Sequence, residues 1–385
     1  MTSLRSSWQT LCDPHFDTIP GQLASSYLPS LDGLRAISIA IVIAGHLLVG
    51  GVFSWYVSGA TGVQIFFAIS GFLITTLLLK EQAATHTISL KRFYIRRVLR
   101  IFPVAYLFLL VMMVINQVFQ LHIDRLDFLM GFLYVKNLTA LHPSAWQTGH
   151  FWSLAVEEQF YLLFPFLIKY NYKLYIRLIF ILLVMIPLAN VYTYHGGQHL
   201  TGTTGIILEV FLDVFGSGMT SILCGSLCAI LLFKRMIRPE SLVRYKALAP
   251  LLVLLLMIGR IKIGVPGWEV LWLFLTGPMA CAAILLSGQP GTWFYRFLNT
   301  KPLRRIGVLS YSLYIWQQIF TSHQPWAHAF PHADAAWINL PALAIVATAS
   351  YYLYEKKFLR LKDRFKAAAK PAGSPAASPT HSIAL

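Results

Sequence analysis

The chain has 385 residues, of which 57% are apolar and only 12% are charged, and its mean hydropathy is +0.62. This composition excludes an ordinary soluble globular domain and indicates a polytopic membrane protein. A formal net charge of +16 would suit a nucleic-acid-binding protein, but the placement of the basic residues explains this charge without nucleic acid as a partner.

Ten apolar stretches are candidates for membrane-spanning helices, because a hydrocarbon core of about 30 Å is crossed by roughly 20 helical residues. In chain order they cover residues 34–53, 61–79, 101–119, 151–168, 175–193, 205–233, 247–259, 268–287, 306–322 and 337–354. The stretch 247–259 is short for a full span. The sequence therefore predicts an all-α fold, a polytopic helix bundle of about ten transmembrane helices within a membrane domain over residues 27–360.

The basic residues predict the orientation of this bundle. With the N-terminus in the cytoplasm, the segments on that side carry 27 of the 31 Lys and Arg residues and those on the outside carry 4. This positive-inside bias places both termini in the cytoplasm. Residues 1–26 form a cytoplasmic segment without the features of a signal peptide, and residues 361–385, rich in Ala, Pro and Ser, are expected to be a disordered cytoplasmic tail.

The four cysteines form neither a C-x-x-C pair nor a disulfide framework. Cys224 and Cys228 share a helix face at a spacing of four residues, where small side chains favour helix packing over a metal site. The sequence predicts no metal site.

Ionisable side chains inside the predicted spans are few, and in a membrane such groups usually face a cavity or a partner. They are His46, Glu157, Glu158, Glu209, Asp213 and Glu269. At a helix rise of about 1.5 Å per residue, His46 lies about 16 Å from the cytoplasmic end of its span and Glu157 about 9 Å below the outer surface. Both therefore fall in the outer half of the membrane.

A histidine and a carboxylate at similar depth suggest general acid–base chemistry, with the carboxylate orienting the imidazole. The less specific alternatives are a hydrogen-bonded core residue for His46 and a helix cap or neutralised bundle end for Glu157. Because Glu157 and Glu158 are about 100° apart around a helix, one would face the site while the other reaches the outer interface.

Basic residues also recur at helical spacing at the cytoplasmic end of the third predicted span. Arg97 and Arg100 fall on one face, where two guanidinium groups could hold phosphates through parallel hydrogen bonds. The alternatives are positive-inside anchoring or contacts with anionic lipid headgroups. Arg35 and His46, eleven residues apart, share one face of the first span because that distance is about three helical turns.

Two further patterns are less informative. Glu209 and Asp213, four residues apart, could contact substrate, pass protons or belong to a solvated helix end. The stretch "HIDRLD", residues 122–127, fits the H-x-x-x-x-D pattern of glycerolipid acyltransferases, but it falls in an outside loop, whereas those enzymes usually meet their acyl donor in the cytoplasm. We therefore assign it no catalytic role.

Six stretches in order resemble the acyltransferase-3 family, integral membrane enzymes that O-acylate glycans, some antibiotics and signalling lipids. They are "YLPSLDGLRAISIAIVIAGH", "GVQIFFAISGFLITTLL", "FYIRRVLRIFPVAYLFLL", "FWSLAVEEQFYLLFP", "IGVLSYSLYIWQQ" and "YYLYEKKFL". The resemblance implies an acyl-CoA cosubstrate, most commonly acetyl-CoA, on the cytoplasmic side, an acceptor hydroxyl on an outside glycan or lipid-linked sugar, and no permanently bound cofactor. It also implies a multi-pass protein in the lipid bilayer of a bacterial inner membrane.

The resemblance also assigns roles to individual residues. The family's histidine corresponds to His46, the glutamate of its W-S-L-x-x-E motif to Glu157, and its R-x-x-R pair to Arg97 and Arg100. Its Leu-Asp-Gly-Leu-Arg segment corresponds to Asp32 and Arg35, and its Ser-Tyr-Ser-Leu-Tyr segment to Ser310 through Tyr314. Many members carry a histidine where this chain has Gln317, which leaves His46 as the main candidate base. Some members carry an extra hydrolase-like domain after the last span; here only a short tail follows, so we expect the chain to act alone or to pass the acyl group to a partner.

The hypothesis is that His46 deprotonates the acceptor hydroxyl, which attacks the thioester, while Glu157 orients His46 and stabilises its protonated form. An acyl-histidine intermediate is a close variant. Arg97, Arg100 and Arg35 would bind acyl-CoA. Supporting or acceptor-lining candidates are Asp32, Ser70, Trp152, Ser153, Glu158 and Tyr311, with Ser70 as a candidate oxyanion donor.

Two other classes stay open at this point. In a proton-coupled transporter of a glycan or lipid-linked sugar, His46, Glu157, Glu209 and Asp213 would form a proton relay, although no inverted repeat is evident. A non-catalytic membrane scaffold would leave these charges without a purpose. Consumption of acyl-CoA by the purified protein would separate the enzyme from both. The acceptor, the acyl chain and the oligomeric state do not follow from the sequence.

Overall fold

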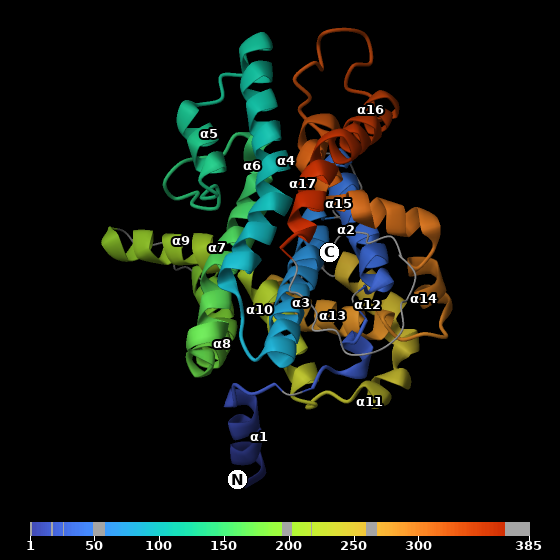
Figure 1. Ribbon diagram of the computed structural model, residues 1–385. Helices are drawn as coiled ribbons and strands as arrows, with labels where there is room; N and C mark the ends of the chain where they lie inside the picture. The colour runs from blue at the N-terminus through green and yellow to red at the C-terminus, as the bar shows by residue number, and fades with distance from the viewer. Residues whose placement is uncertain are drawn as a thin grey trace.

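The computed structural model describes residues 2–16, 18–25, 27–48, 58–194, 202–216, 218–258 and 268–365. Within these ranges it is helical and contains no β-strand (Figure 1). The longer helices are α1 (Thr2–Cys12), α2 (Pro29–Leu47), α3 (Gly59–Thr85), α4 (Leu90–Val118), α5 (Arg125–Phe132), α7 (Phe151–Tyr170), α8 (Tyr172–Tyr194), α9 (Thr203–Phe215), α10 (Met219–Phe233), α12 (Ala249–Ile258), α13 (Trp268–Ser287), α15 (Lys301–Thr321), α16 (Ala336–Ala349) and α17 (Lys356–Asp363). The shorter ones are α6 (Trp146–Gly149), α11 (Pro239–Val243) and α14 (Trp293–Leu298), and a π-helical turn (Ser350–Glu355) joins α16 to α17.

The predicted all-α fold is confirmed for the described residues. Six of their helical segments are long and apolar enough to cross a membrane: Pro29–Leu47, Gly59–Thr85, Leu90–Val118, Trp146–Tyr170, Tyr172–Thr193 and Ala336–Asp363. The predicted span 205–233 is a helix pair, α9 and α10, bent by 47°. The predicted spans 247–259, 268–287 and 306–322 are helical as α12, α13 and α15 but do not meet the same criteria of length and composition.

Ten spans and cytoplasmic termini therefore remain predictions. Arg260, Lys262, the side chain of Glu269 and residues 366–385 lie outside the described part of the chain.

The centre of the bundle is α3, whose most apolar window is 83% buried inside the protein, against 33% for α4 and 28% for α8. Glycines allow α3 and α10 to approach closely. A Cβ atom added at Gly71 would lie 1.9 Å from the carbonyl oxygen of Ile222, and one at Gly225 would lie 2.1 Å from that of Ala68. Small residues at such crossings are typical of membrane helices, where packing rather than water drives association.

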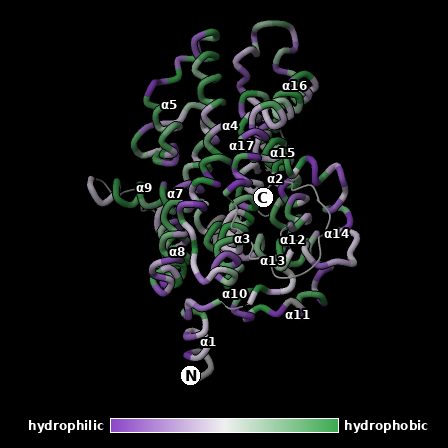
Figure 2. The backbone as a smooth tube through the Cα atoms, viewed as in Figure 1, coloured by the Kyte–Doolittle hydropathy of each residue, from purple (hydrophilic) through white to green (hydrophobic). Residues whose placement is uncertain are grey.

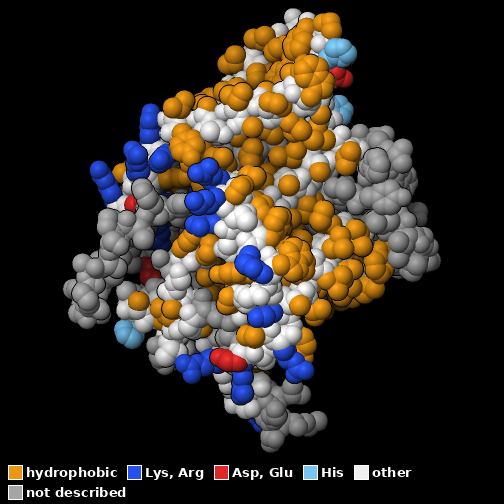
Figure 3. All heavy atoms as spheres, turned by 90° about the vertical axis from the view of Figure 1, so that its right-hand side faces the viewer, with side chains coloured by type: hydrophobic (Ala, Val, Ile, Leu, Met, Phe, Trp, Pro, Cys, Tyr) orange, Lys and Arg blue, Asp and Glu red, His pale blue; other side chains and the backbone are white. Residues whose placement is uncertain are grey.

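The outer surface carries the lipid-facing side chains. Hydrophobic residues run along most of the helices in Figure 2, and Figure 3 shows hydrophobic side chains over much of one face, with Lys and Arg gathered towards one side and the lower end. Large apolar side chains are exposed on the peripheral helices, among them Val114 and Val118 of α4 and Val184 and Leu188 of α8. In water these side chains would be unfavourable, whereas a bilayer accommodates them.

Candidate active site

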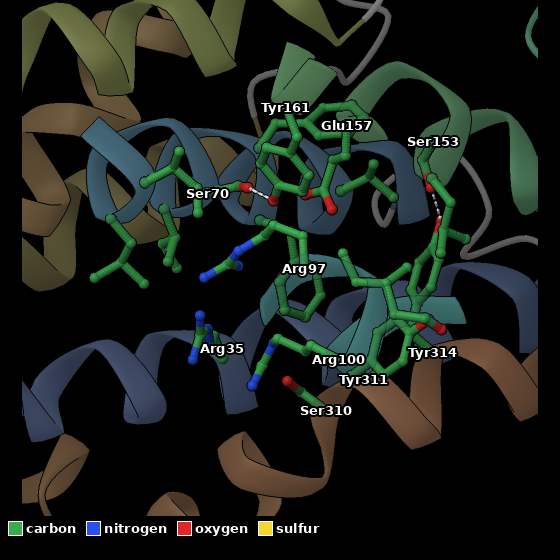
Figure 4. A pocket seen from close by; sticks show the side chains of 18 of the residues that line it. Arg35, Ser70, Arg97, Arg100, Ser153, Glu157, Tyr161, Ser310, Tyr311 and Tyr314 are labelled. Carbon is green, nitrogen blue, oxygen red and sulfur yellow. Dashed lines mark hydrogen bonds between the residues drawn. The ribbon is translucent and has the colours of Figure 1, made fainter. Parts of the chain in front are cut away.

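A cavity lies between α2, α3, α4, α7 and α15 (Figure 4). Its charged lining residues are Arg35 from α2, Arg97 and Arg100 from α4, and Glu157 from α7. The guanidinium groups gather on one side of the cavity and the Glu157 carboxylate points into it (Figure 4). The structure thus brings together the arginines and the glutamate that the sequence analysis selected from three separate segments.

The three guanidinium groups outnumber the single carboxylate in this cavity. Arg97 lies over the rings of Phe93 and Tyr161, 5.7 Å from each ring centroid, and its Nε atom is buried without a hydrogen-bond partner. An excess of cationic groups in a weakly polar environment favours a ligand that carries several negative charges. Guanidinium groups in particular pair with phosphates in bidentate geometry.

Hydroxyl groups complete the polar lining. Ser70 and Tyr161 are hydrogen-bonded to each other, and both line the cavity together with Glu157 (Figure 4). Ser153 pairs with Tyr314 in the same way on the α15 side. The Tyr311 hydroxyl donates to the Ile101 carbonyl at 2.7 Å, so it is held by the backbone of α4.

Arg35 is positioned by residues at the start of α2. Its Nη1 atom donates to Asp32 at 3.4 Å, and the other oxygen of Asp32 accepts from the Tyr27 hydroxyl at 2.6 Å. Arg304 of α15 in turn donates to the Tyr27 oxygen at 3.1 Å and lies over its ring. Burial and the adjacent Asp32 carboxylate raise the pKa of Tyr27, so its hydroxyl remains a donor. Asp32 therefore supports the cavity without lining it.

His46 lies in the last turn of α2, outside the lining of this cavity. Its Nδ1 atom is 2.7 Å from Gln317 Oε1, and its ring meets Trp146 edge-on at a centroid distance of 5.6 Å. Among the described contacts no hydrogen bond joins His46 to Glu157, so the expected pairing is replaced by one with Gln317. Depth along two helices does not determine which helices are neighbours, and α2 packs against α15 here.

A chain of side-chain amides fixes the geometry of this histidine. Gln317 Nε2 donates to Gln318 Oε1 at 3.0 Å, and Gln318 Nε2 donates to the Trp146 carbonyl at 2.9 Å. This order leaves Gln317 Oε1, which can only accept, facing His46. The proton of an uncharged His46 is therefore on Nδ1, and Nε2 keeps its lone pair.

Other candidates take structural positions. Trp152 packs against Phe67 at a centroid distance of 5.8 Å and is not among the cavity-lining residues. The Oε1 atom of Glu158 is buried without a hydrogen-bond partner, and its carboxylate is close enough to Glu157 and Arg97 to interact with them electrostatically. Neither Trp152 nor Glu158 lines the cavity that contains the arginines.

The acidic pair of the transporter hypothesis also lies away from the cavity. Asp213 accepts hydrogen bonds from the Thr139 hydroxyl at 2.8 Å and the Ala140 amide at 2.9 Å, so it holds the loop before α6. Glu209 is exposed. These contacts explain Asp213 without proton transport.

Asp127, the last residue of the "HIDRLD" stretch, has a structural role. Asp127 forms a buried ion pair with Lys136, and Thr148 donates to the same carboxylate. Asp127 also accepts from the Ala145 amide at 3.0 Å, so it joins α5 to the start of α6. Burial lowers the pKa of Lys136, while the adjacent carboxylate opposes that shift.

Neither Tyr161 nor His150 was named from the sequence, and Tyr314 was named only as the end of the family segment Ser310–Tyr314. Tyr161 and Tyr314 bring hydroxyl groups into the cavity. His150, two residues before the W-S-L-x-x-E motif, is 3% exposed, and neither ring nitrogen has a hydrogen-bond partner. A histidine two residues before a selected tryptophan could have been noted as part of the same motif.

Comparisons with known proteins agree with the geometry. A family model described as an acyltransferase domain matches residues 28–355. The chain is 28% identical over 333 residues to the O-acetyltransferase OatA of Staphylococcus aureus, covering 78% of this chain and 52% of that protein. It is 29% identical over 357 residues to the peptidoglycan O-acetyltransferase OatA of Listeria monocytogenes, covering 86% of this chain and 55% of that protein.

The chain spans about half the length of the curated relatives it matches. No solved structure matches it significantly. Because the family model covers most of the chain and includes every residue of the arginine-lined cavity, the protein belongs to the acyltransferase-3 family.

Proposed function

We propose that this protein is a membrane O-acyltransferase that moves an acyl group, acetyl in the first instance, from cytoplasmic acyl-CoA to a hydroxyl of an extracytoplasmic glycan or glycan precursor. The observation that carries the proposal is the convergence of Arg35, Arg97 and Arg100 on one cavity. Coenzyme A carries a pyrophosphate and a 3′-phosphate, and these are the anions that a cluster of guanidinium groups binds best.

His46 is the proposed base. Its Nδ1 proton is held by Gln317, so Nε2 is available to take the proton of the acceptor hydroxyl. The resulting alkoxide attacks the thioester carbonyl and the CoA thiolate leaves. Glu157 balances the charge of the arginines, and it lines the cavity beside the hydrogen-bonded pair Ser70 and Tyr161. The acyl-histidine variant uses the same nitrogen as nucleophile.

Peptidoglycan is the proposed acceptor, because one relative is named for it. We also propose that the protein lies in the bacterial inner membrane, with about ten spans and both termini in the cytoplasm. The predicted distribution of 27 basic residues inside and 4 outside supports this orientation. That orientation would place the acceptor outside and the donor inside. Reporter fusions at residues 90 and 330 would test it, since the predicted topology puts the first in the cytoplasm and the second outside.

The test of the donor site uses purified protein in lipid nanodiscs with acetyl-CoA and soluble muramyl glycan fragments, and it measures released CoA thiol and acetylated glycan. We expect Arg97→Gln to raise the KM for acetyl-CoA strongly. Arg96→Gln is the matched control, because Arg96 lies on the same helix but donates to the Phe365 carbonyl and pairs with Glu81. Equal KM values for the two variants, or no consumption of acetyl-CoA by the wild type, would contradict the proposal.

A further inference from the structure

His150 is a buried imidazole that local packing does not explain. It lies between α6 and α7, is 3% exposed, and both of its ring nitrogens lack hydrogen-bond partners. The backbone of Ile315, in α15, lies near the ring, but neither ring nitrogen meets it in hydrogen-bonding geometry. Buried polar groups are nearly always paired, so an unpaired imidazole points to a group that binds there.

The surroundings of this ring are aromatic. Phe108, Phe151 and Tyr314 lie at centroid distances of 5.1, 5.0 and 5.7 Å from it. A phenylalanine would make the same contacts without burying two polar nitrogens. The packing therefore accounts for a ring at this position but not for a histidine.

His150 is close to both parts of the candidate site. Its carbonyl oxygen accepts from the hydroxyls of Ser153, at 3.0 Å, and Tyr314, at 3.3 Å, and both of these residues line the cavity. Its ring also lies near enough to His46 to interact with it electrostatically. An uncharged imidazole at this place carries one N–H donor that nothing in the described structure uses.

We propose that His150 is a second catalytic histidine, whose uncharged ring donates a hydrogen bond to the thioester carbonyl oxygen during acyl transfer. This inference rests on the proposed function and supplies the oxyanion donor that the mechanism otherwise lacks. Uncharged imidazoles are known to polarise carbonyl groups in other enzymes. A donor aimed at the oxygen where charge develops stabilises the transition state more than the bound substrate.

Acyl transfer from the thioester to the acceptor passes through an oxyanion. His46 takes the proton of the acceptor hydroxyl, and the acceptor oxygen forms a bond to the carbonyl carbon while an electron pair moves to the carbonyl oxygen. His150 donates its N–H to that oxyanion. The C=O bond then reforms, the C–S bond breaks, and the CoA thiolate receives the proton from His46.

The experiment compares wild type, His150→Phe and His150→Gln in nanodiscs with acetyl-CoA and muramyl glycan fragments, measuring kcat, KM and thermal stability. Loss of one oxyanion donor lowers kcat by about 10²- to 10³-fold in other enzymes. We expect a loss of that order for His150→Phe, with KM for acetyl-CoA within about twofold and a Tm no lower than that of wild type. His150→Gln, which keeps an N–H donor, should retain clearly more turnover than His150→Phe.

The control is His142→Phe, which removes an imidazole outside the site. If His150→Phe does not fold, His150→Leu provides a second variant without a donor, with kcat read per folded protein. A folded donorless variant with wild-type kcat would overturn the inference, as would equal losses in all His150 variants accompanied by a lower Tm. The wild-type rate and the Arg97→Gln result report separately on the proposed function.

Discussion

The interaction between His46 and Gln317 gives the most informative single substitution. Gln317→Leu keeps the size and apolar stem of a fully buried side chain but removes the oxygen that accepts from His46 Nδ1. The imidazole then loses the contact that fixes its rotation and its tautomer. We expect slower turnover with unchanged donor binding, because Gln317 lies outside the arginine-lined cavity.

The size of the effect follows from the hydrogen bond. A neutral hydrogen bond of this kind contributes about 0.5–1.5 kcal/mol net. If the lost free energy is the energy that holds His46 in its reactive orientation, kcat falls roughly 2- to 13-fold, since about 1.4 kcal/mol corresponds to a factor of ten. The substitution also leaves the Gln318 Oε1 atom without its donor, which adds to the loss. A roughly twofold decrease in kcat is therefore the minimum that we expect.

The assay is acetyl transfer from acetyl-CoA to muramyl glycan fragments, with kcat and KM determined separately. Gln317→His, the residue that many family members carry, restores an acceptor nitrogen and should recover most of the turnover. Gln324→Leu is the control, because Gln324 is also buried in this region but donates to the Phe320 carbonyl. Wild-type kcat in Gln317→Leu, or an equal loss in Gln324→Leu, would refute the role given to this contact.

Three further substitutions test the support of the site and of the bundle. Tyr27→Phe removes one donor to the carboxylate that holds Arg35, so the KM for acetyl-CoA should rise a few-fold while kcat changes little. Gly71→Ala forces α3 and α10 apart and should cost about 1–3 kcal/mol, seen as a lower Tm in detergent. Asp127→Asn leaves Lys136 buried without its counter-charge, which costs about 3–5 kcal/mol and should sharply reduce the folded fraction.

Each of these has its own control. Tyr295→Phe removes a hydroxyl from the same inner region without touching the Asp32 contact, so a matching rise in KM would contradict the role of Tyr27. Unchanged Tm for Gly71→Ala would mean that the helices do not approach as closely as described. The pair Asp127→Leu with Lys136→Met should recover much of the stability, because two apolar side chains replace the buried ion pair.

The sequence predicted the helical fold because long apolar runs can satisfy their backbone only as helices in a membrane. It also selected Glu157, because charged residues inside apolar segments are costly and therefore few. Arg97 was selected by its helical spacing with Arg100, and Arg35 by the helix face that it shares with His46 and by the family resemblance. Their meeting in one cavity depends on how α2, α4 and α7 pack, which no single segment specifies.

The contact of His46 with Gln317 was not predicted, for a related reason. Rise per residue gives depth, but not the identity of the neighbouring helix, and the amide that reaches His46 comes from a segment 271 residues away. His150 was missed because a buried unpaired nitrogen becomes evident only when every neighbour has been placed. Three predicted spans, 247–259, 268–287 and 306–322, are helical where the structure describes them but do not meet the criteria of length and composition that six other segments meet, so as spans they stay predictions.

The most direct test of the proposed mechanism is acyl transfer from radiolabelled acetyl-CoA to surface glycans in membranes that carry wild type, His46→Ala or Arg97→Ala at equal expression. The mechanism predicts label in a glycan with the wild type, none with His46→Ala, and a higher acetyl-CoA requirement with Arg97→Ala. Transfer by His46→Ala at the wild-type rate would contradict the assignment of His46 as the base, and absence of label with every acyl-CoA in all three membranes would contradict acyl transfer itself.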